Sequence, residues 1–373
     1  MRIFVDASTL APSIGGISRY LASLLKEMQR QSEGQHEWIV CGRNSLLHQY
    51  VSQKNSSIHT DHLPPHIGRI LSLGTTLPYW AARDRPDVFW GPAHRLPVWL
   101  PAKTRRVVTI HDMCWLLAAE TMRTSTRILD AVLMPKALRS ADAVITVSSS
   151  TRDALLEHFP AVSGKLSLIH EGASALPEPM PAVFLNQWGI SAPYVLFVGT
   201  LEPRKNLLRL LEAFARVKRS PNKPSNCSTQ LVIVGGSGWG SDNLQIALNG
   251  LGVSNNVRIL GHVPDTELST LYRHAHCLAL PSLYEGFGLP LVEAMAQGTP
   301  VMTSSTSSMP EVAGQAGCLV NPLDVDSIAT GLSDILFKPD YRNQLASFSK
   351  EQAAKFSWVQ AATETLKVLT QSP

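Results

Sequence analysis

Two glutamates with seven residues between them flank a glycine-rich turn in the second half of the chain, and their types and spacing suit sugar chemistry. Glu285 stands just before the turn and Glu293 lies eight positions further on. Gly286 and Gly288 let a ligand approach the backbone closely, and Pro290 is typical of the first turn of a helix. Backbone N–H groups at such a helix start form an anion site. Carboxylates beside it can accept hydrogen bonds from the hydroxyl pairs of a sugar and a ribose.

The plain alternative for this pair is a loop charge and a solvated helix residue, because glutamates at this spacing are common. In the glycine and proline context we interpret Glu285 as an acceptor for the transferred sugar and Glu293 as an acceptor for the ribose. The backbone between them is expected to bind phosphate, through Gly286, Phe287, Gly288 and Leu289.

Two adjacent cations, Arg204 and Lys205, follow another apolar run, which covers residues 195–198 and ends at Gly199. Preorganised cations stabilise the negative charge that builds up on a departing diphosphate. Arginine can bind two phosphate oxygens, whereas lysine acts as a point charge. Most Arg-Lys pairs serve solubility only, but their position at a strand end favours a phosphate site, to which we also assign Gly199.

The first half of the chain offers fewer candidates. His111 follows the apolar run 107–110, and a neutral imidazole there can exchange hydrogen bonds with a sugar hydroxyl. A packed loop histidine is the alternative, since the chain has 12 histidines. Asp112 suits helix capping at least as well as catalysis. Gly15 and Gly16 precede the first expected helix and either admit phosphate to the backbone or form a flexible turn.

Two further groups lie late in the chain. We assign Glu311 to the site, because it follows Pro310 and the serines of the loop 304–308. The serines are either phosphate contacts or polar loop residues. Asp324 and Asp326 have the spacing of a metal motif, but a helix cap fits them better.

Short apolar runs alternate with helical patterns through the whole chain, as in sheets that are covered by helices on both faces. Strands are expected at 3–5, 38–41, 87–90, 107–110, 143–147, 166–169, 195–198, 231–234, 257–260, 277–280 and 301–302. Helices are expected at 17–28, 125–138, 207–217 and 357–369. The predicted fold class is α/β, with two Rossmann-like, doubly wound domains.

The domain boundary is expected where prolines accumulate. We predict an acceptor-binding domain at 1–175, a linker at 176–193, a sugar-nucleotide-binding domain at 194–352, and a C-terminal helix within 353–373 that packs back toward the first domain. The polar loop 220–228 is expected to be an exposed insertion. Ligands of such sheets bind beyond the carboxyl ends of the strands, so both domains are expected to face one cleft.

The segment 281–300 resembles the E-x7-E signature of the retaining, family 4-like glycosyltransferases of the GT-B fold. The turn 199–206 resembles the Arg-Lys-Asn turn of that family. Its other motifs match Gly15-Gly16-Ile17, His111-Asp112 and Pro310-Glu311-Val312 in the right order, over nearly the whole chain. The resemblance implies transfer with retention of configuration, without metal and without a cofactor, the sugar nucleotide being a co-substrate. It also implies that His111 lies near the transferred sugar.

Similarity to O-antigen and other surface-polysaccharide transferases implies a mannose-type hexose carried by GDP and a glycan or lipid-linked acceptor. The alternatives are a UDP-sugar-dependent glucosyl-type transferase, a GT-B epimerase or phosphorylase, and an inactive partner that binds nucleotide sugars. Paired glutamates also suit a glycosidase, but Arg204 and Lys205 prepare the site for a diphosphate. No residue is an obvious covalent nucleophile, so we hypothesise front-face attack assisted by the leaving phosphate oxygen.

The composition limits the partners. A net charge of +4 suits a polyanionic small molecule or an anionic membrane surface, and it is too weak for nucleic acid. Five dispersed cysteines without a CxxC pair indicate reduced thiols. The first residues look like a strand rather than a signal peptide, and no stretch approaches a membrane span. We expect a cytoplasmic protein with a possible peripheral contact through 67–85, unless that stretch is a core-facing helix.

Overall fold

A computed structural model of the chain describes residues 1–10, 15–43, 47–51, 55–60, 68–190, 193–220, 228–239 and 244–371. The chain divides into two compact units. The first unit contains Met1–Trp115, Thr124–Gly172 and Ser357–Pro373, and the second contains Leu116–Arg123 and Ala173–Phe356.

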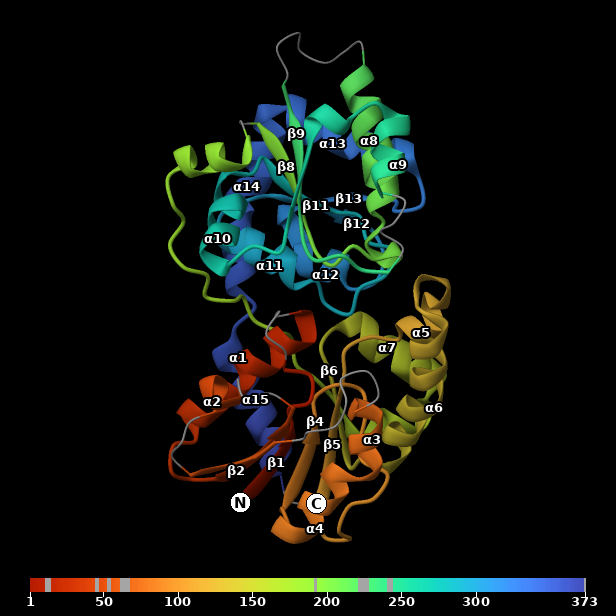
Figure 1. The fold of residues 1–373 in the computed structure, drawn as a ribbon, viewed down its shortest axis with the longest axis vertical. Coiled ribbons are helices and arrows are strands. Elements are labelled where there is room, and N and C mark those ends of the chain that lie inside the picture. The colour runs from red at the N-terminus through yellow and green to blue at the C-terminus, as the bar shows by residue number, and fades with distance from the viewer. Residues whose placement is uncertain are drawn as a thin grey trace. The chain divides into compact units, whose positions relative to one another are not determined.

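A parallel sheet forms the centre of the first unit, and its seven described strands run in the order β3-β2-β1-β4-β5-β6-β7. The strands are β1 (Arg2–Asp6), β2 (Glu37–Gly42), β3 (Ser56–Thr60), β4 (Val88–Gly91), β5 (Arg105–Ile110), β6 (Ala143–Thr146) and β7 (Leu166–Leu168). Helices lie on both faces of this sheet (Figure 1). They are α1 (Gly16–Gln31), α2 (Leu47–Tyr50), α3 (Gly68–Gly74), α4 (Thr76–Asp84), α6 (Thr124–Ser140), α7 (Ser149–His158) and α15 (Trp358–Thr370). The short helix α5 (Cys114–Leu117) begins in this unit, and its last two residues belong to the second.

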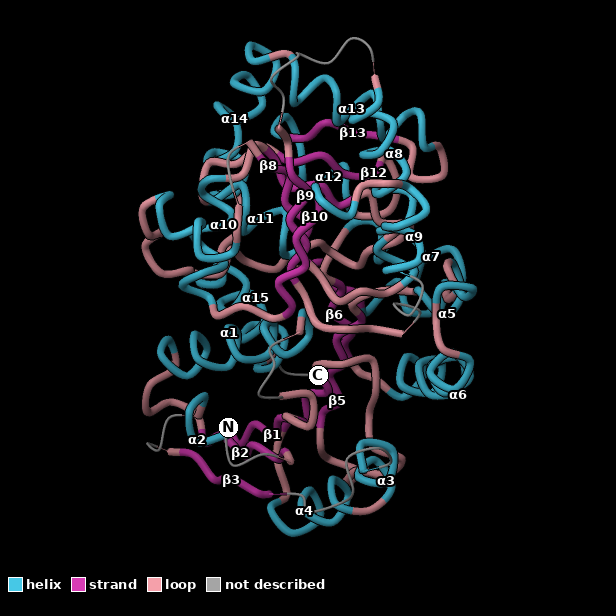
Figure 2. Tube along the Cα trace, turned by 45° about the horizontal axis from the view of Figure 1, so that its top comes forward, coloured by secondary structure: helices cyan, strands magenta, loops and turns pink. Residues whose placement is uncertain are grey.

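The second unit repeats this architecture with six described strands in the order β10-β9-β8-β11-β12-β13. They are β8 (Tyr194–Val198), β9 (Gln230–Val234), β10 (Val257–Gly261), β11 (Cys277–Leu280), β12 (Val301–Ser304) and β13 (Gly317–Val320). The helices are α8 (Leu207–Arg219), α9 (Leu244–Leu251), α10 (Asp265–His274), α11 (Leu289–Ala296), α12 (Met309–Ala313), α13 (Val325–Phe337) and α14 (Pro339–Ala354). Figure 2 shows the central strands of each unit with helices to either side of them, and β3 at the margin of the first unit.

The central strands form because they are apolar on both faces. All residues of β4, β6, β8, β9, β11 and β12 are buried, as expected for parallel strands between two helical layers. The eleven predicted strands are confirmed, and so are the predicted helices α1, α6, α8 and α15. The predicted α/β class with two doubly wound sheets is confirmed as well.

The prediction missed the edge strands β3 and β13. In β3 no residue is fully buried, and β13 alternates buried with more exposed residues. Edge strands lack a neighbour on one side, so they need fewer apolar side chains. Periodicity in the sequence carries little signal for such strands.

The proline-rich stretch expected as a linker packs against α10 of the second unit. The Met180 N–H donates to Thr270 Oγ1 over 2.9 Å, and the Ser269 hydroxyl donates to the Pro177 carbonyl over 2.5 Å. A 3-10 turn, η3 (Ala182–Trp188), follows. Residues 221–227 of the expected insertion lie outside the described residues.

The stretch considered for membrane contact is divided between core and surface, because Ile70, Leu71 and Tyr79 are exposed. Leu73 and Leu77 belong to the hydrophobic core of the first unit, and Trp80 packs against it. The indole of Trp80 also stacks on the imidazole of His59, with ring centroids 3.8 Å apart. Ile67 lies outside the described residues. Among the described residues, no helix has the length and apolar character needed to cross a bilayer.

Candidate active site

The polar residues of the second unit converge where β8 and β11 end. These strands are hydrogen-bonded neighbours, with Leu196 opposite Leu278. The carboxyl ends of parallel neighbours meet at one edge of the sheet, where ligands of such folds bind. The turn after β8 carries Arg204 and Lys205, and the turn after β11 carries Ser282 to Gly288. A hydrogen bond from the Leu283 N–H to the Arg204 carbonyl, 2.8 Å long, joins the two turns.

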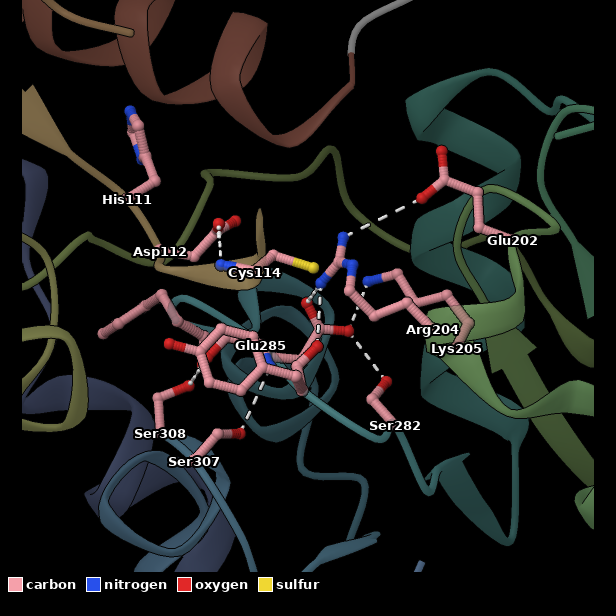
Figure 3. Close-up of polar contacts among 12 residues, drawn as sticks. His111, Asp112, Cys114, Glu202, Arg204, Lys205, Ser282, Glu285, Ser307 and Ser308 are labelled. Atoms are coloured by element: carbon pink, nitrogen blue, oxygen red, sulfur yellow. Dashed lines mark hydrogen bonds and ion pairs between the residues drawn. The ribbon is translucent and has the colours of Figure 1, made fainter. Parts of the chain in front are cut away.

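Arg204, Lys205 and Glu285 form a buried ion cluster (Figure 3). Arg204 Nη1 lies 2.6 Å from Glu285 Oε2 and also donates to the Tyr284 carbonyl over 2.9 Å. Lys205 Nζ lies 2.5 Å from Glu285 Oε1, which accepts a further hydrogen bond from the Ser282 hydroxyl over 2.7 Å. The cluster thus sets two cations against one buried carboxylate.

The cluster strongly favours the ionised form of Glu285. Burial by itself raises the pKa of this carboxyl, but the charges of Arg204 and Lys205 and the hydrogen bonds from Lys205 and Ser282 outweigh burial and lower the pKa to about 2. Burial lowers the pKa of Lys205, and the Glu285 carboxylate opposes that change. Glu202 lies 3.9 Å from Arg204 with its side chain 34% exposed, so solvent screens its charge.

The serines of the loop after β12 hold the glycine turn. The Glu285 N–H donates to Ser307 Oγ over 3.2 Å. The Ser308 hydroxyl donates to the carbonyls of Glu285 and Phe287 over 3.0 and 3.1 Å. Ser304 donates to the Ser282 carbonyl. In the structure, the hydroxyls of Ser304, Ser307 and Ser308 therefore have backbone partners within the protein.

Gly199 and Gly288 occupy positions that favour glycine. Gly199 has φ +153°, and a Cβ there would lie 3.4 Å from Lys205 Cε. Gly288 has φ +103° and caps α11, and Pro290 stands in the first turn of that helix as its sequence predicts. The other turn residues, Gly286, Phe287 and Leu289, are buried.

Sequence reasoning missed two features that position the cations. Gly235, with φ +146°, packs against Gly199 so closely that a Cβ would lie 2.0 Å from the Gly199 carbonyl oxygen. The signal for it was present, because the glycine-rich stretch 235–240 directly follows a buried apolar run. Asn206, at φ +60°, donates through its side-chain amide to the Pro281 and Pro322 carbonyls over 2.9 and 2.6 Å. It thereby ties the Arg-Lys turn to the end of β11.

The remaining predicted residues of the second unit lie around the same turn. Glu293 is 3% exposed on α11, and its Oε2 accepts a hydrogen bond from the Tyr272 hydroxyl over 3.0 Å. The ring of Phe287 packs edge to face on Phe356 at 5.3 Å, so this residue presents backbone rather than ring to the turn. Glu311 lies half-buried on α12, directly after the serine loop.

In the first unit His111 follows β5, as predicted, and is 5% exposed. Its Nε2 donates to the Pro92 carbonyl over 2.8 Å, and its Nδ1 lies 3.3 Å from Glu171 Oε1. The ring of Tyr20 meets the imidazole edge to face at 4.6 Å. Sequence reasoning expected a nitrogen available to a sugar, whereas both ring nitrogens have protein partners here. It also missed Glu171, which stands two residues after an expected strand.

The other candidates of the first unit are simpler. Asp112 caps the turn that follows it, accepting a hydrogen bond from the Cys114 N–H over 2.9 Å (Figure 3). Gly15 precedes α1 and Gly16 begins it, and a Cβ on either would meet no atom within 4 Å. In the second unit Asp324 caps α13 through the Asp326 N–H, which confirms the helix-cap interpretation.

Comparison with known proteins identifies both halves of the chain. Residues 186–352 match the model of glycosyl transferases group 1, and residues 14–175 match that of glycosyltransferase family 4. The O-antigen chain mannosyltransferase B of Escherichia coli is 30% identical over 388 residues, which cover 98% of this chain and 98% of that protein.

Two solved structures share the fold over their full length. Sucrose-phosphate synthase from Thermosynechococcus elongatus superposes with a TM-score of 0.79 and 22% identity, covering 99% of this chain and 98% of that one. HepE of Anabaena, solved in complex with UDP-glucose, superposes with a TM-score of 0.78 and 20% identity, and both chains are covered completely. The two units therefore have the GT-B fold.

Proposed function

We propose that this chain, which belongs to glycosyltransferase family 4, transfers a mannose-type hexose from a GDP-sugar to a glycan or lipid-linked acceptor in surface-polysaccharide synthesis. The observation that carries the proposal is the cluster of Arg204 and Lys205 on a single buried carboxylate at the ends of two neighbouring strands. The similarity to an O-antigen mannosyltransferase along 98% of the chain supports the choice of sugar and pathway.

The excess of cations suits a diphosphate. A leaving nucleoside diphosphate gains negative charge in the transition state, and fixed cations in a dry site stabilise that charge more than they stabilise the neutral sugar. Glu285 holds both cations in place before the donor binds, so little reorganisation is needed. The N–H groups at the start of α11 add the positive end of a helix dipole. These residues supply the role that a metal ion plays in other transferases.

The glutamates and His111 are assigned to the sugars. In our proposal Glu285 accepts hydrogen bonds from the transferred hexose and Glu293 accepts them from the ribose. Glu311 lies near the diphosphate, and His111 contacts the hexose.

Transfer then proceeds by front-face attack: the bond from C1 to the phosphate oxygen breaks, the acceptor oxygen bonds to C1 from the same face, and its proton passes to the departing phosphate. The product retains the anomeric configuration.

The acceptor and the site of action are part of the proposal. A lipid-linked oligosaccharide would place the reaction at the cytoplasmic face of the membrane, with the protein in the cytoplasm or peripherally bound there. A UDP-sugar donor is the second candidate, because the solved relative HepE holds UDP-glucose on the same fold. A GT-B epimerase would convert the donor without any acceptor.

Thermal unfolding with a panel of nucleotides tests the donor. A ligand at 100 times its dissociation constant stabilises the native state by about 2.7 kcal/mol. We expect GDP and GDP-mannose to raise the melting temperature more than UDP, ADP or TDP and their sugars. A larger rise with UDP-glucose would favour the second candidate. Release of nucleoside diphosphate only with an acceptor present excludes the epimerase, and an inverted product would refute front-face attack.

A further inference from the structure

Both ring nitrogens of His111 and its backbone carbonyl have partners in the protein, and these partners indicate where the hydrogens of the ring lie. A carbonyl oxygen only accepts hydrogen bonds, so the 2.8 Å contact with the Pro92 carbonyl requires a hydrogen on Nε2. The other ring nitrogen, Nδ1, lies 3.3 Å from Oε1 of Glu171. The Thr151 hydroxyl donates to the His111 carbonyl over 2.9 Å and fixes the backbone.

The contact with Glu171 requires a second proton. Two lone pairs facing each other in a buried site would repel, so one proton lies between Nδ1 and Oε1. Both side chains are almost fully buried, at 7% and 6% exposure. A hydrogen between Nδ1 and Oε1, together with the hydrogen on Nε2, satisfies all three groups and leaves the pair without net charge.

The groups around this pair are compatible with that arrangement. Burial lowers the pKa of His94 to about 4, so this neighbouring ring, 5.3 Å away, is neutral near pH 7. Burial raises the pKa of Tyr20, so its hydroxyl stays protonated. Asp112, whose charge also acts on His94, is engaged with the Cys114 N–H.

We propose that Glu171 is a positioning residue, which keeps both ring nitrogens of His111 as donors. The proposal rests on the proposed function in one respect, namely that His111 contacts the transferred sugar. With Nδ1–H bonded to Glu171, Nε2–H exchanges the Pro92 carbonyl for a sugar oxygen when the donor binds. A ring that already carries both hydrogens accepts no proton, so His111 is not the base for the acceptor hydroxyl.

Nitrogen NMR on the full chain with ¹⁵N-labelled histidine tests the proton positions without reference to activity. The His111 signals are assigned as those that disappear in His111→Gln. We expect both ring nitrogens of His111 to carry hydrogen at pH 7 in the wild type and in Glu171→Asp. In Glu171→Gln the side-chain amide can donate to Nδ1, so Nδ1 should lose its hydrogen while Nε2 keeps it. An unprotonated ring nitrogen in the wild type, or the same pattern in wild type and Glu171→Gln, overturns the proposal.

Kinetics separate positioning from packing. We expect Glu171→Gln to lower kcat about tenfold, as for the loss of one charge-assisted hydrogen bond, with the donor KM changed less than twofold. Glu171→Asp, which restores the carboxylate, should recover most of kcat. The exposed Glu157→Gln on α7 serves as the matched control and should leave kcat unchanged.

Unchanged kcat in Glu171→Gln, or no recovery in Glu171→Asp at equal melting temperature, overturns the positioning role. If the wild type transfers no sugar at all, the proposed function fails, and the nitrogen spectra still decide where the protons lie.

Discussion

In each unit a buried polar cluster follows a strand, and these two clusters differ in charge. In the second unit, Arg204 and Lys205 surround Glu285 with bonds of 2.5 and 2.6 Å. In the first unit, His111 pairs with Glu171 over 3.3 Å beside the aromatic rings of Tyr20 and Trp90. The first kind of cluster has positive charge to spare for an anion. The second has no charge to spare and instead fixes the direction of its hydrogen bonds.

This difference in charge determines how the stability of each cluster responds to a substitution. Removing one member of a buried ion cluster leaves an uncompensated charge, which is strongly destabilising. Beside the His111–Glu171 pair, Thr109 forms hydrogen bonds with the uncharged side chains of Tyr20 and Trp90. Removing such a partner costs the desolvation of the groups left behind, a smaller quantity that does not depend on acid titration. Four measurements test this contrast.

The largest effect is expected on catalysis from Lys205→Ala and Arg204→Ala. Loss of a fixed charge-stabilising donor costs about 2–4 kcal/mol of transition-state stabilisation, which corresponds to a fall in kcat between about thirtyfold and a thousandfold. Steady-state kinetics with a donor found in the thermal screen measure it. Arg216→Ala is the matched control, because Arg216 lies on α8 in an exposed pair with Asp326. Near-normal kcat in both single variants would contradict the diphosphate assignment.

The next effect concerns acid stability. The pKa of Glu285 is lowered to about 2 in the folded chain, against 4.5 for the free group. Its ionisation therefore stabilises the folded state above pH 4.5, by roughly 3 kcal/mol at 1.36 kcal/mol for each pKa unit. This contribution is lost as the pH falls from 4.5 toward 2. Glu285→Gln should unfold at a lower temperature than wild type at pH 7, and the gap should shrink between pH 5 and pH 3. A gap independent of pH would show that Glu285 is not the group concerned.

The uncharged hydrogen bonds of Thr109 supply the contrasting experiment. Thr109 Oγ1 accepts from the Trp90 indole over 3.0 Å and bonds to the Tyr20 hydroxyl over 3.2 Å, all within the core. Thr109→Val keeps the volume but leaves two buried groups without this partner, at a cost of about 2 kcal/mol. We expect a lower melting temperature of the first unit, by the same amount at pH 5 and pH 3. A pH-dependent loss would mean that a charged group takes part in these hydrogen bonds, contrary to our interpretation.

The sequence predicted the sheets and the charged turn well because both depend on local patterns. Central strands such as β8 and β11 are continuous apolar runs. Because Gly199, Arg204 and Lys205 follow β8 closely in the sequence, the two cations must lie near the carboxyl end of that strand. The edge strands β3 and β13 escaped because their half-exposed residues have no such pattern.

The contacts among distant residues could not be predicted in the same way. Asn206 joins the Arg-Lys turn to carbonyls 75 and 116 positions away, and Glu171 meets a histidine 60 positions before it. Such pairs depend on how strands are ordered in the sheet, which periodicity does not encode. The same holds for Ser304, Ser307 and Ser308, whose hydroxyls bond to backbone groups 21 to 23 positions earlier in the chain.

The smallest effect is expected at Glu293 on α11, the residue to which we assign the ribose. Its Oε2 accepts from Tyr272, both residues being buried, so a ribose has to compete for the same carboxylate. Glu293→Gln replaces one acceptor oxygen by a donor and should weaken nucleoside diphosphate binding about tenfold, or 1.4 kcal/mol, with kcat at saturating donor nearly unchanged. Tyr272→Phe removes the competitor and leaves the carboxylate, so affinity should stay equal or rise. Titration calorimetry of wild type and both variants measures these values. Equal affinity in wild type and Glu293→Gln would remove Glu293 from the ribose role, and the Tyr272 bond would then be a packing feature of α10 and α11.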